Sequence, residues 1–326
     1  MTQATKTSVG LATATVLRSI YPFACAEYPC KVAQTAHLDA FMPITLTIGS
    51  LHYDIMVEAD HLPRPDETAI GARWYPKFGG KGGNQAVAAA KAGATSRMIG
   101  AVGEDDFGRF LRANLTQSGV EDRFIATIPT VGSGMSVAIL NAAGDYAATI
   151  VSGANLHLSA ASLANDAAWD GVGLLILQNE VPEAINLEAA KQAHKRAIPT
   201  LLNAAPFRAL GAAFRALIDI LVVNAVEAEM MGTGPVTDLA SAARAAQDLA
   251  AQGKTVIVTA GGAGLAAVGP DGAELQVAAE KVKVVSSHGA GDAFIGALAV
   301  QLADGAGLEM ACRAASQAAA RHVAGL

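Results

Sequence analysis

The sequence predicts an α/β fold: a mostly parallel β-sheet covered by helices on both faces, with a small second sheet over one end. Three observations support this prediction. From residue 43 onward, strand-like runs alternate with helical segments, as in successive βαβ units. Residues 172–177 form a continuous apolar run, typical of a strand buried on both faces. Alternating strands near residues 53–78 and 124–151 interrupt the βα order and indicate the second sheet.

Composition excludes several classes of protein. The chain has 326 residues, of which 52% are hydrophobic and 16% charged, so it can bury a large core and is not a disordered chain. The formal net charge of −6 argues against a nucleic-acid partner. No apolar run reaches the ~18–20 residues of a membrane span, which argues against a membrane partner. The cysteines Cys25, Cys30 and Cys312 are too few for a disulfide scaffold, so we expect a reducing, cytoplasmic location.

Residues 1–41 differ from the rest of the chain. They contain Lys6, Arg18 and Lys31 but no acidic residue before Glu27, a bias found in targeting peptides. They lack the clean apolar stretch of a secretory signal. We expect an N-terminal extension outside the fold, with an ordered appendage or a targeting segment as alternatives. The folded domain then spans residues 42–326.

The first half of the domain begins with a short strand at 44–48. An alanine-rich helix at 81–92 is bounded by glycines, and a strand at 97–102 follows it. Residues 106–118 place apolar side chains on one helical face and stop at Gly119.

The second half repeats this alternation after the apolar run. We expect strands at 172–177, 200–203, 218–223, 255–259 and 282–285, and helices at 183–196, 238–252, 293–302 and 308–323.

The small sheet is assigned to strands within about 52–60, 70–78 and 124–151. In the second of these segments, Trp74, Pro76 and Phe78 alternate with basic or polar neighbours, which is the period of a strand.

The strongest chemical signal is the segment Ser286-Ser-His-Gly-Ala-Gly-Asp-Ala-Phe-Ile-Gly296, which opens a helix. Its small residues expose backbone N–H groups at a helix N-terminus, where anions bind. Asp292 lies in the first turn and can be a catalytic group or a simple helix cap. A dinucleotide fingerprint fails because Phe294 occupies the third glycine position. A Walker loop fails because Lys254 precedes a strand rather than a helix.

A second signal is Phe78-Gly-Gly-Lys-Gly-Gly-Asn-Gln-Ala-Val87, four glycines and a lysine before a helix. These glycines allow a backbone to approach a small polar ligand closely, and Asn84 offers a donor and an acceptor to a hydroxyl. A flexible turn is the alternative.

Two weaker signals follow strands of the main sheet. Asn224-Ala-Val-Glu227 comes directly after one strand, and Thr259-Ala-Gly-Gly-Ala-Gly264 ends the next. Ligands of α/β folds bind at such carboxyl ends. A solvated helix start and an ordinary hairpin are the alternatives.

Taken together in this order, the four motifs resemble those of the ribokinase-like (PfkB) family of carbohydrate kinases. The resemblance covers about residues 43–325, and Gly79-Gly-Lys-Gly-Gly-Asn-Gln-Ala-Val-Ala-Ala is similar to the ribokinase form of the motif. It implies a three-layer α/β/α sandwich with a small inserted sheet as a lid. It also implies transfer of the γ-phosphate of ATP to a hydroxymethyl group of ribose or a related sugar.

The resemblance also implies roles for single residues. Asp292 would be the catalytic base, and the N–H groups of Gly289, Ala290 and Gly291 an anion hole. Sugar contacts would come from the following residues: His52, Asp54, Gly80, Lys81, Asn84 and Glu180. ATP contacts would come from the following residues: Asn224, Thr259, Gly261 and Gly264. Glu227 would hold Mg²⁺ through water.

Two departures and two alternatives accompany these implications. His52 replaces an asparagine of the ribokinase form, which counts against ribose itself. Ser286 replaces an aspartate that helps to hold a monovalent cation, and the chain stops at Leu326 before a segment that completes that site, so both count against activation by potassium. In dimeric members two lids interlock, so a homodimer is expected. The alternatives are a nucleoside kinase, with Trp74, Phe78 or Tyr146 lining a base slot, and a non-catalytic sugar or nucleotide sensor.

Overall fold

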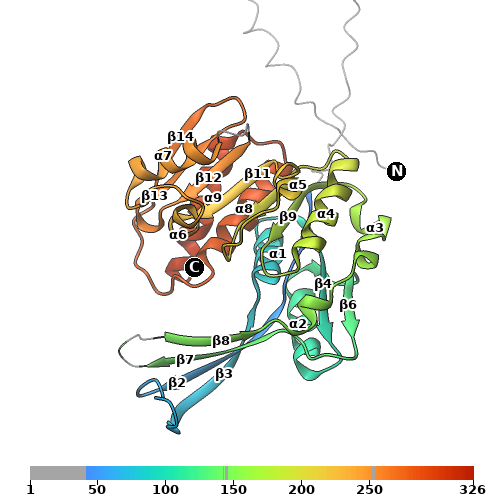
Figure 1. Cartoon of the computed structure of the whole chain (residues 1–326), viewed down its shortest axis with the longest axis vertical. Coiled ribbons are helices and arrows are strands. Elements are labelled where there is room, and N and C mark those ends of the chain that lie inside the picture. Colours follow the sequence, from blue (N-terminus) through green and yellow to red (C-terminus); the bar gives the residue numbers. More distant parts are fainter. Residues whose placement is uncertain (1–41, 142, 144–145, 251–253) are drawn as a thin grey trace, which may run out of the picture. The chain divides into compact units, whose positions relative to one another are not determined.

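The large sheet forms the centre of the fold. The structure is a computed structural model that describes residues 42–141, 143, 146–250 and 254–326, so the expectation for residues 1–41 lies outside the described residues. The sheet has ten strands in the order β14-β13-β12-β11-β10-β9-β1-β4-β5, with β6 also paired to β4 (Figure 1). All of its pairs are parallel except those that join β12 to β13 and β13 to β14. Its strands are β1 (Ile44–Ile48), β4 (Thr95–Gly103), β5 (Val120–Glu121), β6 (Ile125–Ile128), β9 (Val172–Gln178), β10 (Thr200–Asn203), β11 (Ile220–Asn224), β12 (Thr255–Thr259), β13 (Gly264–Val268) and β14 (Glu274–Ala278).

Helices cover both faces of this sheet. They are α1 (Lys81–Lys91), α2 (Asp106–Gln117), α3 (Asp166–Trp169), α4 (Glu183–Lys195), α5 (Ala212–Arg215), α6 (Ala225–Met230), α7 (Leu239–Ala250), α8 (Ala290–Ala303) and α9 (Leu308–Ala324), with 3₁₀ turns η1 (Gly153–His157), η2 (Ala160–Leu163) and η3 (Gly261–Ala263). Alternate residues of β9 point to opposite sides, as a strand requires. Leu175 and Leu177 belong to the core shared with α4 and α7, whereas Leu174 and Ile176 belong to the core shared with α8 and α9. The predicted fold class is therefore confirmed.

The small sheet has four strands in the order β3-β2-β7-β8. They are β2 (His52–Ala59), β3 (Gly71–Gly79), β7 (Met135–Asn141) and β8 (Tyr146–Val151), and they extend away from the large sheet at the lower left of Figure 1. β2 pairs antiparallel with β3 and parallel with β7. Because β2 follows β1 after only three residues, the small sheet begins where a central strand of the large sheet ends.

Two local predictions were wrong. Residues 125–128, which the sequence placed in the small sheet, pair in parallel with Gly100–Gly103 of β4 in the large sheet. Residues 282–285 form no strand, because Val284 and Val285 are exposed and this segment has no sheet partner. Instead, the Val285 N–H donates to the Val323 carbonyl of α9 at 2.8 Å.

Helices α1 and α8 pack against each other through small residues. A Cβ added at Gly296 of α8 would lie 2.4 Å from the Cβ of Ala88 in α1, closer than real side chains approach. The alanine-rich sequence of α1 and the glycine of α8 thus bring the two backbones together. Among the described helices, none combines the length and apolar character required to cross a membrane.

Candidate active site

A small cavity lies at the carboxyl ends of β10, β11 and β12, beside the N-terminus of α8. We call it the central cavity; its volume is about 120 Å³. Asn203, Asn224 and Thr259 end the three strands and line it. Its other polar lining comes from Lys81, Glu227, Gly289, Gly291 and Asp292. Ligands of open α/β sheets bind at this edge, outside the carboxyl ends of the parallel strands. Residues from all four sequence motifs therefore meet where a ligand is expected.

The N-terminus of α8 presents backbone donors to the central cavity. Gly289 has φ 82°, a left-handed conformation that glycine adopts without strain, and it turns the chain into the helix. The Ala290 N–H donates to the Ser287 carbonyl over a long 3.3 Å. The first N–H groups of a helix have no acceptor within it. A Cβ added at Gly291 would meet open space, so a ligand can approach this first turn closely.

Asp292 is buried in this first turn, with only 8% of its surface exposed. Its carboxylate accepts hydrogen bonds from Asn84 Nδ2 at 3.1 Å and from Gln85 Nε2 at 2.9 Å. Burial raises the pKa of Asp292, while the charge of Lys81 and the two amide hydrogen bonds oppose this rise. A carboxylate in this setting is held in place and has a greater proton affinity than one in water.

Glu180 joins two of the glycine-rich segments. It follows β9, and its Oε2 accepts from Ser50 Oγ at 2.5 Å and from the Lys81 N–H at 2.8 Å. Ser50 lies in the turn between β1 and β2, so the carboxylate holds this turn against the start of α1. The structure therefore brings Glu180 and Lys81 together, as the sequence analysis expected for the sugar-contacting group.

Close contacts and one left-handed backbone conformation explain why glycines occur at the start of α1. Gly80 has φ 87°, and a Cβ on Gly82 would lie 2.5 Å from the Ser50 backbone nitrogen. A Cβ on Gly79 would lie 2.0 Å from Asp54 Oδ2. The backbone of this segment therefore lies directly against the β1–β2 turn and the first residues of β2.

Asp54 and His52 lie at the base of the small sheet. Asp54 Oδ1 accepts from Ser136 Oγ of β7 at 2.5 Å. Lys77 of β3 is paired with Asp54 in register, and burial lowers the pKa of Lys77 while the charge of Asp54 opposes the change. His52 is 4% exposed, and its Nε2 has no hydrogen-bond partner among the described residues.

Asn224 and Glu227 form a reciprocal cap at the start of α6. The Asn224 side chain accepts from the Glu227 N–H at 2.9 Å, and Glu227 Oε2 accepts from the Asn224 N–H at 2.9 Å. Burial raises the pKa of Glu227, and the Asn224 N–H and Lys81 oppose this rise. No cluster of three or more acidic, histidine or cysteine ligands occurs in the described part of the chain. A single buried carboxylate, with one oxygen held by the Asn224 N–H, fits Mg²⁺ because this ion usually keeps several waters and takes only one or two protein carboxylates.

The three motif residues from the end of β12 to the start of β13 differ in their surroundings. Thr259 lines the central cavity. Gly261 has φ 53°, and a Cβ there would meet open space. Gly264 has φ 118°, and a Cβ there would lie 2.1 Å from the Val277 carbonyl oxygen of β14. The pairing of β13 with β14 is therefore enough to explain the glycine at position 264, whether or not a ligand binds there.

Sequence reasoning missed several polar neighbours of the motif residues: Ser50, Gln85, Ser136 and His288. Gln85 had no reliable signal, because successive residues of a helix point in different directions and its place after Asn84 does not imply a shared partner. Ser50 and Ser136 had none, because their partners lie more than 80 residues away, with separations of 130 and 82.

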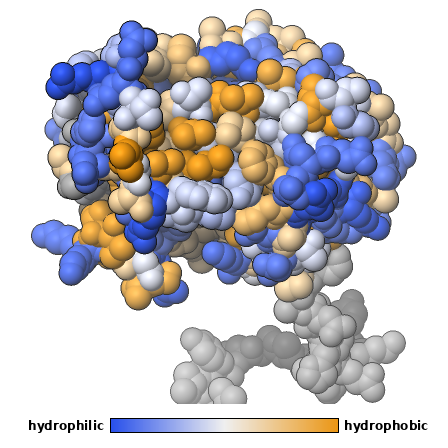
Figure 2. All heavy atoms as spheres, turned by 90° about the horizontal axis from the view of Figure 1, so that it is seen from below, coloured by the Kyte–Doolittle hydropathy of each residue, from blue (hydrophilic) through white to orange (hydrophobic). Residues whose placement is uncertain are grey.

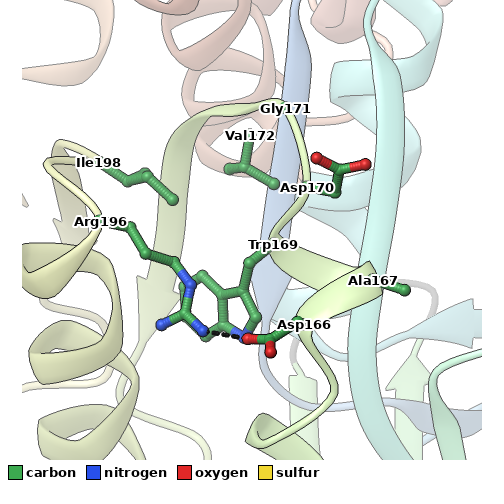
Figure 3. Close-up of a pocket in the computed structure, with 8 residues that line it drawn as sticks. All are labelled: Asp166, Ala167, Trp169, Asp170, Gly171, Val172, Arg196 and Ile198. Atoms are coloured by element: carbon green, nitrogen blue, oxygen red, sulfur yellow. Dashed lines mark hydrogen bonds and ion pairs between the residues drawn. The ribbon is translucent and has the colours of Figure 1, made fainter.

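A larger hollow of about 530 Å³ lies at the opposite edge of the large sheet. It is lined by residues that precede β9 and β10, including Trp169, Gly171 and Ile198. Figure 3 shows the Arg196 guanidinium beside the Trp169 ring and paired with Asp166. Since amino ends of parallel strands are not where α/β sheets bind their ligands, its size does not make it the active site.

Comparison with known proteins decides the family. The model of the pfkB family carbohydrate kinases matches residues 44–324. This chain belongs to that family. A mouse ribokinase is 34% identical over 79% of this chain and 81% of its own. A deoxyribokinase of Salmonella typhi is 33% identical over 85% of this chain and 92% of its own.

Solved structures agree with this membership of the pfkB carbohydrate kinase family. A ribokinase of Arabidopsis thaliana, complexed with ribose and ATP, matches with a TM-score of 0.79 and 28% identity over 86% of this chain and 92% of its own. A ribokinase from Thermotoga maritima matches with a TM-score of 0.77 and 29% identity over 87% of this chain and 93% of its own. The protein is thus a ribokinase-like pfkB kinase, a phosphotransferase that acts on a sugar hydroxyl.

Proposed function

We propose that this protein transfers the γ-phosphate of ATP to the hydroxymethyl group of ribose or of a closely related sugar. The observation that carries the proposal is the position of Asp292. Its buried carboxylate lies in the first turn of α8, lines the central cavity and is held by two amides of α1. A base between an anion site and a polar glycine-rich segment has the arrangement that phosphoryl transfer to an alcohol requires.

Asp292 would accept the proton of the sugar hydroxyl as its oxygen attacks the γ-phosphorus. The bond from the γ-phosphorus to the β,γ-bridging oxygen breaks, and ADP leaves with the electron pair. The raised pKa of Asp292 suits a base, because proton affinity closer to the working pH favours transfer. The N–H groups of Gly289, Ala290 and Gly291 would stabilise the charge on the transferring group.

The sugar would lie between the base of the small sheet and the start of α1. The backbone of Gly80 and the side chains of Asp54, Lys81, Asn84 and Glu180 offer charged and polar groups for its hydroxyls. Buried polar atoms without a partner are costly, and the unpartnered His52 Nε2 is such an atom, which supports its place in the same site. The ribokinase relatives support ribose, and the deoxyribokinase relative supports 2-deoxyribose as the next candidate.

ATP would occupy the side of Asp292 that faces β11 and β12. Asn224, Thr259, Gly261 and Gly264 would line its site, and Glu227 would order waters of Mg²⁺. When bound, Mg²⁺ neutralises charge on the phosphate groups. The Glu227 carboxylate would hold those waters, and the bond from the Asn224 N–H to its Oε2 keeps the carboxylate in place.

A substrate panel tests the proposal. ADP formation is measured with ATP, Mg²⁺ and one of ribose, 2-deoxyribose, fructose, adenosine or inosine, with and without K⁺. We expect ribose or 2-deoxyribose to give the highest kcat/KM. Preference for a nucleoside by more than tenfold would replace the sugar with a nucleoside acceptor. Binding of ATP and a sugar without ADP formation would make the protein a sensor.

The small sheet would act as a lid and as the interface of a homodimer. In register, Val57 lies beside Trp74 on one side and Ile139 on the other, so one face of this sheet is apolar. Trp74 is 63% exposed. Figure 2, a view from this end of the molecule, shows apolar residues gathered between charged ones. Exposed apolar area of this kind is typical of a protein contact.

A charge on the apolar face tests the dimer. We expect the wild type to have the mass of two chains in multi-angle light scattering, and Trp74→Asp to shift it toward one. The control Trp74→Phe should keep the wild-type mass. A wild type that is monomeric at micromolar concentration would exclude this interface.

A further inference from the structure

A second cavity extends from Asp292 on the side of α1 and α9. We call it the outer cavity; its volume is about 650 Å³, and it lies among α1, α8, α9 and the loop before α8. Asn84 and Asp292 line it together with Lys77 and His288. It therefore reaches the same carboxylate as the central cavity, and it includes Asn84 from the residues proposed to hold the sugar.

His288 occupies the position directly before Gly289, and its backbone is fixed on both sides. Its N–H donates to Ser286 Oγ at 3.3 Å, and its carbonyl accepts from His322 Nε2 at 2.9 Å. Its imidazole makes no hydrogen bond among the described residues and is accessible to solvent. A ring on a fixed backbone that lines a cavity and has no partner of its own is available to a ligand.

Charged groups from several elements lie near the ring. Partial burial and Lys77 lower the pKa of His288, Asp54 and Asp292 raise it, and Lys81 lowers it. These four groups come from β2, β3, the start of α1 and α8. His288 thus lines the same cavity as Asn84, which is proposed to bind the sugar, and as the Asp292 carboxylate.

We propose that the His288 imidazole binds the acceptor directly, as a hydrogen-bond partner of a sugar hydroxyl at the mouth of the outer cavity, and so helps to determine acceptor specificity. This inference rests on the proposed sugar kinase function. It adds a residue from the loop before the anion hole to a site otherwise built from the small sheet, α1 and Glu180.

The chemistry favours a neutral polyol over an anionic acceptor. A lowered pKa keeps the ring neutral near pH 7, and a neutral imidazole has one donor and one acceptor nitrogen. A hydroxyl can pair with either nitrogen. The phosphate group of a phosphorylated sugar could accept one hydrogen bond from this ring, but a neutral ring would not attract its charge.

Variants of His288 test the inference with ribose as the acceptor, or with the best acceptor of the panel. We expect His288→Ala to raise the acceptor KM about fivefold, the usual effect of one lost neutral hydrogen bond, while kcat and the ATP KM stay within twofold. His288→Gln keeps a donor and an acceptor and should recover at least half of the loss. The matched control His194→Ala removes an exposed imidazole from α4 and should leave all constants unchanged.

A second variant separates the ring from the position of its loop. His322→Ala removes the hydrogen bond to the His288 carbonyl but leaves the His288 ring. We expect a smaller rise in acceptor KM than for His288→Ala. Equal rises in the two variants, or an unchanged acceptor KM in His288→Ala with an active wild type, would overturn the inference and leave the sugar kinase function intact. A wild type that phosphorylates no acceptor of the panel would overturn both.

Discussion

Asp292 shows how single residues set the chemistry of this site. A buried carboxylate is costly unless it is paired, and here two neutral amides and the nearby Lys81 compensate only part of the cost. The result is a carboxylate with a raised pKa that points into a polar cavity. A structural helix cap needs no such burial, so this environment favours a catalytic role over capping alone.

Removal of this charge should stop turnover. We expect Asp292→Asn to lower kcat by about 10²–10⁴-fold, because an amide cannot accept the hydroxyl proton. ATP and sugar binding, followed by isothermal calorimetry, should change little. The control Asp304→Asn changes an exposed aspartate at the other end of α8. Retention of a tenth of wild-type kcat in Asp292→Asn would remove Asp292 from the role of base.

The pH dependence of activity should report the hydrogen bond from Gln85. This bond lowers the pKa of Asp292, so Gln85→Met, which lacks the donor, should raise it further. The base works only when deprotonated. Activity lost as pH falls should therefore be lost at a higher pH in Gln85→Met than in the wild type. A pH profile of kcat/KM measures the shift, and an unshifted acid limb would contradict the assignment. Gln247→Met on the exposed side of α7 is the control.

Glu227 should affect the metal rather than the sugar. Glu227→Gln keeps the shape of the helix cap but removes the charge that would order the waters of Mg²⁺. We expect the Mg²⁺ concentration for half-maximal rate to rise several-fold at saturating sugar, with the sugar KM within twofold. The opposite pattern, a higher sugar KM with an unchanged Mg²⁺ requirement, would place Glu227 beside the sugar.

At the scale of elements, the glycine-rich start of α1 fixes how closely the helix approaches the β1–β2 turn. Gly82→Ala places a Cβ 2.5 Å from the Ser50 backbone nitrogen, a contact with backbone that cannot move aside cheaply. We expect a loss of about 1–3 kcal/mol of stability, the typical cost of overpacking, and a higher sugar KM. Chemical denaturation measures the first effect.

The control for that variant is Gly234→Ala, because a Cβ at Gly234 meets nothing within 4 Å. Its stability should remain within about 0.5 kcal/mol of the wild type, as for ordinary surface changes. Equal stability of Gly82→Ala and the wild type would show that the β1–β2 turn can move away.

Local patterns predicted most elements but not every partner. The apolar run of β9 and the bounded helix α1 could be identified because burial on both faces and flanking glycines leave local signals. The strand Ile125–Ile128 was recognised as a strand, but alternation does not say which sheet a strand joins. The sequence of residues 282–285 has the alternation of a strand. In the described structure these residues pair with no sheet, and their valines lie exposed.

The site shows the same limit. The glycines and the aspartate at the start of α8 stand in a motif and could be found from the sequence. Ser50, Gln85 and Ser136 act through partners that only the folded chain brings near, and no sequence spacing encodes these contacts. His288 was quoted within its motif, but its significance depends on the outer cavity.

At the scale of the whole molecule, the site joins parts of the chain that are far apart in sequence. The bond from Asn84 to Asp292 spans 208 residues, and the bond from Ser50 to Glu180 spans 130. Such contacts form only when the large sheet is complete, because α1 and α8 must both be seated on it. Binding of both substrates should therefore raise the midpoint of global unfolding rather than that of one part.

The close packing of Ala88 against Gly296 influences the environment of Asp292 from a distance. Because Gly296 has no Cβ, the two helices lie close together about one turn from Asp292, where the amides of α1 bind its carboxylate. A larger residue at Gly296 would push the two helices apart and weaken the hydrogen bonds from α1 to Asp292. No residue proposed to contact a substrate would be changed. Graded replacements at Gly296, which lines neither cavity, would therefore tune the strength of the base from outside the site.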